Sequence, residues 1–405
     1  VDKYIKNRSN NVLVICCPYK HLIDQWEENI KDIFNNIDII KCYDDKKKWD
    51  QKLNNLLQKI AFGKQEFGII ITTAYKGSKD YFIKTLNTDK LNKIVICDEV
   101  HNIGSKKNKR FLNIRAKAKL GLSATPIRPY DEEGNKAIKE YFGKSVYKLG
   151  LKEAIFELES LVKYNYNLFF CKLDGIEYEE YKKYSKKIAM LYSNKENFDE
   201  DKLLQLLVDR SKIVATCSQK LKKFKDILDD LDDYNNMIVY TAEVPSYFEE
   251  TLNILNNRGI KTLKIVSKVK NKRRKEIINK FSNKDINCIL GMRCLDEGVD
   301  IPSADKAIIL SSSTNYKQYI QRRGRILRKD KAGEKKVANI YDFLVIPPRF
   351  EYETDKKLYE RELKRILEFA STAKNKTEII SKLLKKKRKN AVMKNFINIF
   401  EEANL

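Results

Sequence analysis

The sequence contains no apolar run long enough to cross a membrane, and no signal-peptide pattern opens it. Its eight cysteines include no Cys-x-x-Cys pair. Most of them stand inside apolar stretches, so we expect buried, reduced thiols rather than disulfides or a zinc site. These absences predict a cytoplasmic protein without a membrane partner.

The chain is long and strongly basic. Its 405 residues are sufficient for two domains and a third small piece. A hydrophobic content of 42% allows real cores, and the formal net charge is +25. Such a charge suggests a polyanionic partner, of which nucleic acid is the commonest. A general lysine-rich bias, with asparagine and isoleucine also abundant, would produce the same charge without any such partner.

The first 150 residues alternate strand-like and helix-like segments. Short, continuous, β-branched runs predict buried strands, and apolar residues three or four apart predict a helix over 19–34. Because strands that alternate with helices form parallel sheets, we expect an α/β domain here. The strand-like runs are 11–17, 68–73, 94–97 and 119–126.

The same pattern returns in the second half of the chain. We therefore expect an α/β domain at 1–150, a helical connector at 151–220, a second α/β domain at 221–348, and a helical, basic segment at 349–405. The second set of strand-like runs is 237–242, 264–267, 287–291, 306–310 and 337–345.

Two acids follow the run 94–97 directly, Asp98 and Glu99, and His101 comes two residues later. At the carboxyl end of a parallel strand, they would lie in the crevice where open α/β sheets bind ligands. One acid can hold Mg²⁺ through its water shell, and the next can orient and deprotonate a water that attacks a phosphate. A strand that ends in a solvated acidic turn would have the same sequence.

Hydroxyl side chains end two other strand-like runs. Thr72 and Thr73 close the run 68–73, where they can bind a nucleic-acid backbone. Threonine is also common in strands for packing reasons alone. Ser123 and Thr125 end the fourth run.

A glutamine and several arginines cluster between Gln321 and Arg328. Arg325 is three residues from both Arg322 and Arg328, so neighbouring guanidinium groups share a helix face and can clamp a phosphoryl group. Gln321 can bond the same group. The alternative is a basic helix that touches nucleic acid or nothing. Gly324 lowers helix stability, which suggests that something approaches it closely.

A loop upstream of the arginines contains Gly298 and Asp300 and ends at Pro302. Gly298 permits close backbone approach, and Asp300 can accept hydrogen bonds from a ribose or from the arginines. An ordinary Asp-Gly turn before a proline is the alternative.

Taken in order, these segments resemble the motors of superfamily 2 helicases of the DEAD/DEAH type. The likeness covers roughly residues 11 to 345, and it is closest to excision-repair helicases and type III restriction subunits. It implies two RecA-like parallel-sheet lobes in tandem, with a helical connector and a helical basic C-terminal segment. The segment 98–101 is similar to motif II, 123–125 to motif III, 72–73 to motif Ib, 18–20 to motif Ia, 237–242 to motif IV, 298–302 to motif V and 321–328 to motif VI.

The resemblance also implies roles for these residues, with ATP and Mg²⁺ as cofactors and ATP bound between the lobes. Asp98 would hold Mg²⁺ through water, and Glu99 would activate the attacking water. The other catalytic residues would be Arg325 and Arg328 as arginine fingers and Gln321 at the γ-phosphate. The residues that couple to the ATP site would be His101, Ser123, Thr125, Gly298 and Asp300. The residues that bind nucleic acid would be Thr72, Thr73, Pro18, Lys20 and Arg322.

One element of the family is missing from the sequence. The first strand of lobe one should carry a phosphate-cradling loop, G-x-x-x-x-G-K-[ST], and no such run occurs here. We expect the loop and its strand upstream of Val1, and we expect weak or no ATPase activity from these residues alone.

Two functions follow as competing hypotheses. The first is an ATP-dependent DNA helicase or translocase, with DNA as partner in preference to RNA. The second is a subunit of a restriction, repair or defence complex that binds nucleic acid or docks a partner without hydrolysing ATP. The basic run 385–389 would help to bind nucleic acid in either case, unless it is only a solvated helix end.

Overall fold

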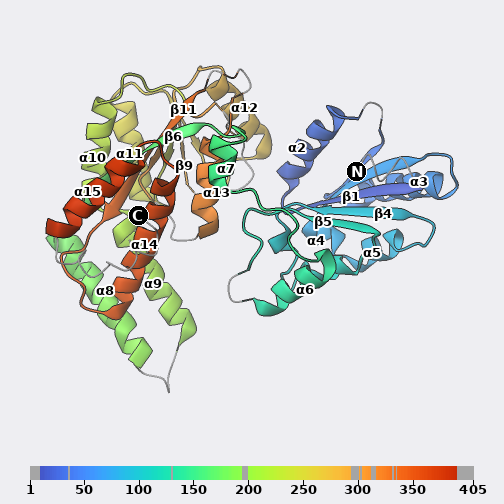
Figure 1. The fold of residues 1–405 in the computed structure, drawn as a ribbon, viewed down its shortest axis with the longest axis horizontal. Helices are drawn as coiled ribbons and strands as arrows, with labels where there is room; N and C mark the ends of the chain where they lie inside the picture. Colours follow the sequence, from blue (N-terminus) through green and yellow to red (C-terminus); the bar gives the residue numbers. More distant parts are fainter. Residues whose placement is uncertain are drawn as a thin grey trace. The chain divides into compact units, whose positions relative to one another are not determined.

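The computed structural model describes residues 10–34, 37–128, 131–193, 199–292, 301, 303–311, 316–330, 333 and 335–389. The chain divides into two compact units, Val1–Lys148 and Leu149–Leu405 (Figure 1). Each unit has its own parallel sheet and its own apolar cores.

The sheet of the first unit has five parallel strands in the order β2-β3-β1-β4-β5. The central strand β1 is buried along its whole length, which explains its continuous apolar sequence. β5 is an edge strand, and Leu120 on it is 43% exposed. The strands are β1 (Asn11–Cys17), β2 (Ile39–Cys42), β3 (Phe67–Thr73), β4 (Asn92–Cys97) and β5 (Ala118–Gly121).

Helices cover both faces of this sheet. α2 buries Ile23 and Ile30 against one face, and α3, α5 and α6 pack against the other through residues such as Leu53, Phe82 and Ile138 (Figure 1). The helices are α2 (Lys20–Lys31), α3 (Asp50–Ala61), α4 (Ala74–Gly77), α5 (Asp80–Leu86) and α6 (Glu132–Phe142), with short 3₁₀ turns at Lys46–Lys48, Val100–Asn102 and Lys109–Asn113.

The sheet of the second unit has six parallel strands in the order β6-β11-β10-β7-β9-β8. The strands are β6 (Lys163–Cys171), β7 (Met237–Tyr240), β8 (Thr262–Ile265), β9 (Cys288–Gly291), β10 (Lys306–Ile309) and β11 (Val337–Val345). The two sheets confirm the predicted fold, two RecA-like α/β lobes in tandem.

Helices also cover both faces of the second sheet. One core contains Phe224 of α10 and Phe248 of α11, and the other contains Phe281 of α12 and Phe369 of α14. α8 and α9 form a pair that projects from the sheet beside α14 (Figure 1). The helices are α7 (Leu151–Phe156), α8 (Gly175–Ser193), α9 (Glu200–Ala215), α10 (Ser218–Asp229), α11 (Pro245–Asn256), α12 (Asn271–Ser282), α13 (Tyr316–Ile326), α14 (Glu353–Ser371) and α15 (Lys376–Lys389).

Two details of the predicted domain layout need correction. The expected helical connector, 151–220, contains β6, which pairs with β11 inside the second sheet. Tyrosines and asparagines alternate along β6, and only its tyrosine side is fully buried, so the strand lacks the apolar run that marks the others. The expected helical tail, 349–405, likewise contains α14, whose Leu363 and Phe369 belong to the core.

The described part of the chain has no helix that is long and apolar enough to span a membrane. Its seven cysteines are all buried and free, as predicted from their apolar surroundings. Cys294 lies outside the described residues.

Candidate active site

Asp98 directly follows β4, and hydrogen bonds with β1 and α2 hold it. Its backbone N–H donates to the carbonyl of Cys16 on β1 at 2.9 Å. Oδ1 accepts from the backbone N–H of Glu99 at 2.9 Å, and Oδ2 accepts from the indole N–H of Trp26 on α2 at 3.1 Å. These hydrogen bonds fix the orientation of the carboxylate. Because Asp98 is only half-buried, part of its side chain still faces solvent.

Glu99 adopts a left-handed backbone conformation, with φ +47° and ψ +53°. A side chain other than glycine pays about 1–3 kcal/mol for such a conformation, which persists only where the surroundings impose it. The next backbone N–H, that of Val100, donates to the carbonyl of Leu122 at 2.9 Å and anchors the turn to the segment after β5. Observed strain at one of the predicted catalytic acids is therefore consistent with a functional turn.

His101 joins the acidic turn to the segment after β5. Its Nδ1 lies 3.0 Å from the hydroxyl of Ser123 and 3.3 Å from Oε2 of Glu99, and the residue is 6% exposed. The Ser123 hydroxyl in turn accepts the backbone N–H of Thr125 at 3.1 Å. Thr125 Oγ1 is buried and has no hydrogen-bond partner within the described residues. The structure thus brings together four of the predicted site residues from two neighbouring strand ends.

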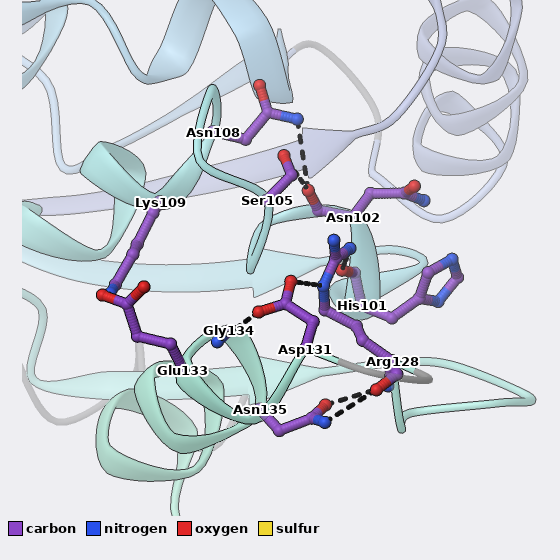
Figure 2. A network of polar contacts seen from close by, with 10 residues as sticks. All are labelled: His101, Asn102, Ser105, Asn108, Lys109, Arg128, Asp131, Glu133, Gly134 and Asn135. Carbon is purple, nitrogen blue, oxygen red and sulfur yellow. Dashed lines mark hydrogen bonds and ion pairs between the residues drawn. The ribbon is translucent and has the colours of Figure 1, made fainter. Parts of the chain in front are cut away.

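Arg128 ties this cluster to α6 (Figure 2). Its Nη1 donates to the carbonyl of His101 at 2.6 Å, and its Nε donates to Asp131 at 2.7 Å. Asn135 on α6 exchanges two further hydrogen bonds with the Arg128 backbone, at 2.9 and 2.8 Å. Asp131 also caps α6 by accepting the N–H of Gly134 at 2.8 Å. The Arg128 guanidinium and this N–H hold the pKa of Asp131 below its ordinary value.

A close approach of two glycines lets α6 reach the site. A Cβ on Gly134 would stand 2.7 Å from the carbonyl oxygen of Gly104, and a Cβ on Gly104 would stand 2.8 Å from Arg128 Cδ. Neither distance is compatible with a side chain, so both positions require glycine for packing reasons.

The predicted nucleic-acid ligands of the first unit are largely occupied within the fold. Thr72 is fully buried and donates its hydroxyl to the carbonyl of Cys42 at 3.0 Å. The Thr73 hydroxyl caps α4 by accepting the N–H of Lys76. Lys20 is exposed and pairs with Asp44 at 2.9 Å, and the neighbouring Pro18 is half-buried. Their role in binding stays a prediction.

The arginines in α13 and just after it divide into a buried and a more accessible set. Arg322 is 4% exposed and donates to the carbonyl of Ser311 at 2.8 Å. Arg323 is 2% exposed and bonds both the carbonyl and the carboxylate of Glu368. Buried Arg322 presents little surface for the nucleic-acid contact expected of it. The residues predicted for catalysis are more accessible: Gln321 and Arg325 are half-buried, and Arg328 is exposed.

Some predicted residues lie outside the described part of the chain. Gly298, Asp300 and Pro302 are among them, and the side chains at 387–389 of the basic run are too. Their roles stay predictions.

The acidic turn has the donors that Mg²⁺ requires, whereas a phosphate cradle is missing. A half-buried carboxylate such as Asp98 suits Mg²⁺, which keeps most of its water when few protein ligands bind it. Within the described residues, no three His, Cys, Asp or Glu side chains gather as a metal site, so a metal held by protein ligands alone does not fit. The sequence also offers no glycine-rich loop for phosphates.

Two contacts of this site were not predicted. Trp26 lies within the helix predicted over 19–34, and a partly buried indole N–H needs an acceptor, which could have signalled a polar neighbour. Arg128 follows the strand-like run 119–126, and no role is predicted for it from the sequence. Its contact with the His101 carbonyl depends on the path of the loop before α6, which has no periodic signal.

Comparisons with known families match both units. Residues 1–128 match the family "Type III restriction enzyme, res subunit", and residues 219–330 match "Helicase conserved C-terminal domain". The chain is 27% identical over 258 residues to the DNA 3'-5' translocase XPB2 of Sulfurisphaera tokodaii, covering 58% of this chain and 56% of that protein. It is 29% identical over 244 residues to putative helicase 22 of Sulfolobus islandicus filamentous virus, covering 58% and 40%. The chain thus spans about half the length of these relatives.

Solved structures share the fold. The helicase domain of Pyrococcus furiosus Hef aligns with a TM-score of 0.54 and 15% identity, over 89% of this chain and 91% of that one. The type ISP restriction-modification enzyme LlaBIII, bound to DNA, aligns with a TM-score of 0.60 and 15% identity, over 94% of this chain and 28% of that one. These structures show the fold alone, whereas the two family matches and the likeness to XPB2 place the chain in superfamily 2 of the helicases, among the DEAD/DEAH-type members.

Proposed function

We propose that this protein is an ATP-driven motor that acts on DNA as a helicase or translocase. The observation that carries the proposal is the contact of His101 with both Glu99 and Ser123, at the carboxyl ends of β4 and β5. Glu99 would activate a water for attack on a phosphate, and His101 and Ser123 connect Glu99 to the segment after the neighbouring strand. This arrangement is suited to couple phosphate chemistry to movement of the chain.

The residues of the two units would have separate tasks. In the first unit, Asp98 would hold Mg²⁺ through water, and Glu99 would orient the attacking water and accept its proton. Mg²⁺, when bound, supplies charge neutralisation at the phosphates. In the second unit, Arg325 and Arg328 would stabilise phosphoryl oxygens through their guanidinium groups.

DNA is the proposed substrate on two grounds. Among the relatives, XPB2 is named a DNA translocase, and LlaBIII was solved with DNA. The net charge of +25 suits any polyanion and does not by itself discriminate DNA from RNA.

A second candidate is a DNA-binding or partner-docking subunit of a restriction or repair complex that does not hydrolyse ATP. The observation that favours it is the absence of a G-x-x-x-x-G-K-[ST] run from the sequence. The motor hypothesis instead requires a cradle from other residues. Among the described strands β5 is the last of its sheet, so a further strand can pair with it there.

Phosphate release measured with and without DNA separates the two candidates. The assay compares this chain with the full product of its gene, here called the extended form. The motor hypothesis predicts DNA-stimulated release by the extended form, and loss of at least a hundredfold in Glu99→Gln. RNA of the same length serves as the matched competitor.

A triplex-displacement assay on the extended form then tests for translocation along DNA. If the extended form binds DNA but neither releases phosphate nor displaces the third strand, the motor hypothesis is wrong and the docking subunit is favoured.

A further inference from the structure

Helix α9 has apolar residues on two of its faces. One face is buried inside the second unit and includes Leu203 and Ile213. The other face carries Leu204, Leu207 and Val208, of which Leu204 is 61% exposed and Val208 41% exposed. None of these three residues belongs to an apolar core of the described part of the chain. Because a surface helix normally has polar residues on its second face, this apolar stripe indicates a contact outside the unit.

The exposed stripe borders a hollow of about 250 Å³, which we call the α9–α14 groove. One wall of this groove is α9, through Leu207, Val208 and Ser211. The opposite wall is one face of α14, whose lining residues are spaced i, i+3, i+4 and i+7. These residues are Thr354, Lys357, Leu358 and Arg361. They cover about two turns of helix, so the groove has room along its length for a short helical segment.

Two cations stand on the α14 wall, Lys357 and Arg361. Both are exposed, and neither forms an ion pair or a hydrogen bond with another described residue. Glu353, one turn before Lys357, is bonded to Lys356 at 3.2 Å. Among the described residues that line the groove, none is acidic. A partner that covers this wall should therefore carry carboxylates.

The third cation of the lining is already neutralised inside the unit. Arg210 of α9 is buried, and its Nη1 lies 2.8 Å from Oδ1 of Asp355. The groove thus has cations along one wall and an apolar stripe along the other, and it lies beside the helix pair α8–α9 that projects from the sheet (Figure 1).

This combination favours a protein helix over nucleic acid. Nucleic acid is bound by cations along its phosphates and by aromatic platforms under its bases. The described lining includes a single aromatic residue, Tyr192 of α8, whereas Leu207, Val208 and Leu358 are aliphatic. Aliphatic side chains are removed from water by other apolar side chains, and an amphipathic helix supplies these at the matching spacing.

We propose that the α9–α14 groove docks an acidic, amphipathic helix of a partner protein. The apolar side chains of that helix lie against Leu207, Val208 and Leu358, and its carboxylates pair with Lys357 and Arg361. The proposal does not depend on ATP hydrolysis or on DNA binding, because all of its residues belong to the second unit.

Fluorescence anisotropy of labelled synthetic peptides, titrated with the whole chain, tests the proposal. The probes are three helix-forming peptides with leucines spaced i, i+3, i+4 and i+7 and with flanking positions of glutamate, glutamine or lysine. The glutamate peptide should bind roughly tenfold more tightly than the glutamine peptide, because two exposed ion pairs each add a few-fold. The lysine peptide should not bind. A shuffled glutamate peptide, with the same composition, controls for the leucine spacing.

Reversal of the two cations tests the charge complementarity. The double variant Lys357→Glu with Arg361→Glu should lose the glutamate peptide and should instead bind the lysine peptide, because the signs on both sides are exchanged. Lys222→Glu makes the same change at an exposed position on α10, outside the lining, and should alter neither affinity.

A second pair of variants tests the apolar stripe without adding a charge. Val208→Gln should weaken binding of the glutamate peptide roughly tenfold, because an apolar side chain that the peptide would bury is lost. Ile176→Gln removes an apolar side chain that is 84% exposed on α8 and lies outside the lining, so it should leave the affinity unchanged. A melting curve for each variant confirms that it is folded.

Each outcome supports or overturns the proposal. Tighter binding of the glutamate peptide that depends on Val208 and switches with the double reversal supports it. Equal affinity for the glutamate and shuffled peptides, or wild-type affinity in either groove variant, overturns it. A DNA oligonucleotide that displaces the peptide and itself depends on Val208 would assign the groove to nucleic acid. A dimer in sedimentation that Val208→Gln dissociates would assign the groove to a second copy of the chain, and both results would overturn the proposed occupant.

Discussion

The indole nitrogen of Trp26 lies 3.1 Å from a carboxylate oxygen of Asp98, across 72 residues of sequence. The contact means that α2 holds the acid predicted to bind Mg²⁺ in one orientation. Because both tryptophans of the chain, Trp26 and Trp49, lie in the first unit, selectively excited tryptophan fluorescence reports on this unit.

A double-mutant cycle should measure this contact. Trp26→Phe removes the N–H donor while keeping a ring, and Asp98→Asn removes the charge. We expect a coupling free energy of about 1–2 kcal/mol between the two changes in urea unfolding, since the hydrogen bond involves an ionised acceptor. Trp49 fluorescence follows the transition in every variant. Additive effects would show that the indole does not hold the carboxylate.

The left-handed backbone of Glu99 allows a second prediction. Glu99→Gly and Glu99→Ala remove the same side-chain contacts, so they differ mainly in backbone conformation. Glycine adopts a positive φ without strain, and we expect the Gly variant to be the more stable by about 1 kcal/mol. The urea midpoint of the first unit measures the difference. At a position with ordinary φ the order would be reversed, so a more stable Ala variant would contradict the observed conformation.

The strands of both sheets could largely be predicted from sequence, because a fully buried parallel strand must be apolar along its whole length. β1 and β11 agree with their predicted bounds. β2 was missed because it has only four residues, one of them a lysine. β6 was missed because its outward positions are asparagines and its buried ones tyrosines, a pattern shared with polar connecting segments.

The candidate site was predictable in part for a similar reason. Strand ends in one parallel sheet meet at one edge, so the meeting of Glu99, His101 and Ser123 followed from the order of the strands. The contacts of Trp26 and Arg128 did not, because they depend on how α2 and an irregular loop pack in three dimensions. Burial of Arg322 was equally invisible, since a basic helix does not reveal which arginines face inward.

Asp131 should contribute to the acid stability of the first unit. Arg128 and the Gly134 N–H lower its pKa in the folded state. A group with a lowered folded pKa stabilises the fold above its unfolded pKa, about 3.9 for aspartate, and loses this contribution as pH falls through the folded pKa. Below about pH 4, the free energy of unfolding of Asp131→Asn should therefore fall less steeply with falling pH than that of the wild type. Tryptophan fluorescence in an acid titration measures this.

The neighbouring Glu132→Gln provides the control for that titration. It removes an exposed carboxylate from the same first turn of α6. The acid transition of this control should match the wild type. Equal slopes for Asp131→Asn and the wild type would mean that the contact with Arg128 has no effect on acid stability.

The helix pair α8–α9 should depend on one buried ion pair for its attachment. Arg210 Nη1 lies 2.8 Å from Asp355 Oδ1, and both side chains are almost fully buried. Asp355 also accepts hydrogen bonds from Tyr181 and Ser185. Removing one partner of such a pair leaves a buried charge, so Arg210→Met should cost about 3–5 kcal/mol. Hydrogen exchange should rise over 175–215 and remain unchanged in the first unit.

The double variant Arg210→Met with Asp355→Leu separates the charge from the packing. With neither charge left in the interior, it should recover much of the lost protection, because replacing both partners by apolar groups is nearly neutral. If the double variant is as exchange-prone as Arg210→Met alone, then packing rather than charge pairing holds the helices.

Lys220 should make the second unit less stable than an apolar residue would. Its folded pKa is lowered by burial, with Cys217, Cys171, Glu362 and Asp342 as the charged or titratable groups that act on it. A lysine with a lowered folded pKa penalises folding while it is protonated. The penalty falls as pH rises from the folded pKa towards the free value of about 10.4, because the unfolded chain then binds the extra proton.

Lys220→Met should therefore stabilise the unit by about 1–3 kcal/mol at neutral pH, and this gain should shrink as pH rises towards 10. Chemical unfolding followed by far-UV circular dichroism at several pH values measures both effects, with Lys222→Met as the control that should show neither. A Lys220→Met variant that is no more stable than the wild type at neutral pH would contradict a destabilising effect of the buried ammonium.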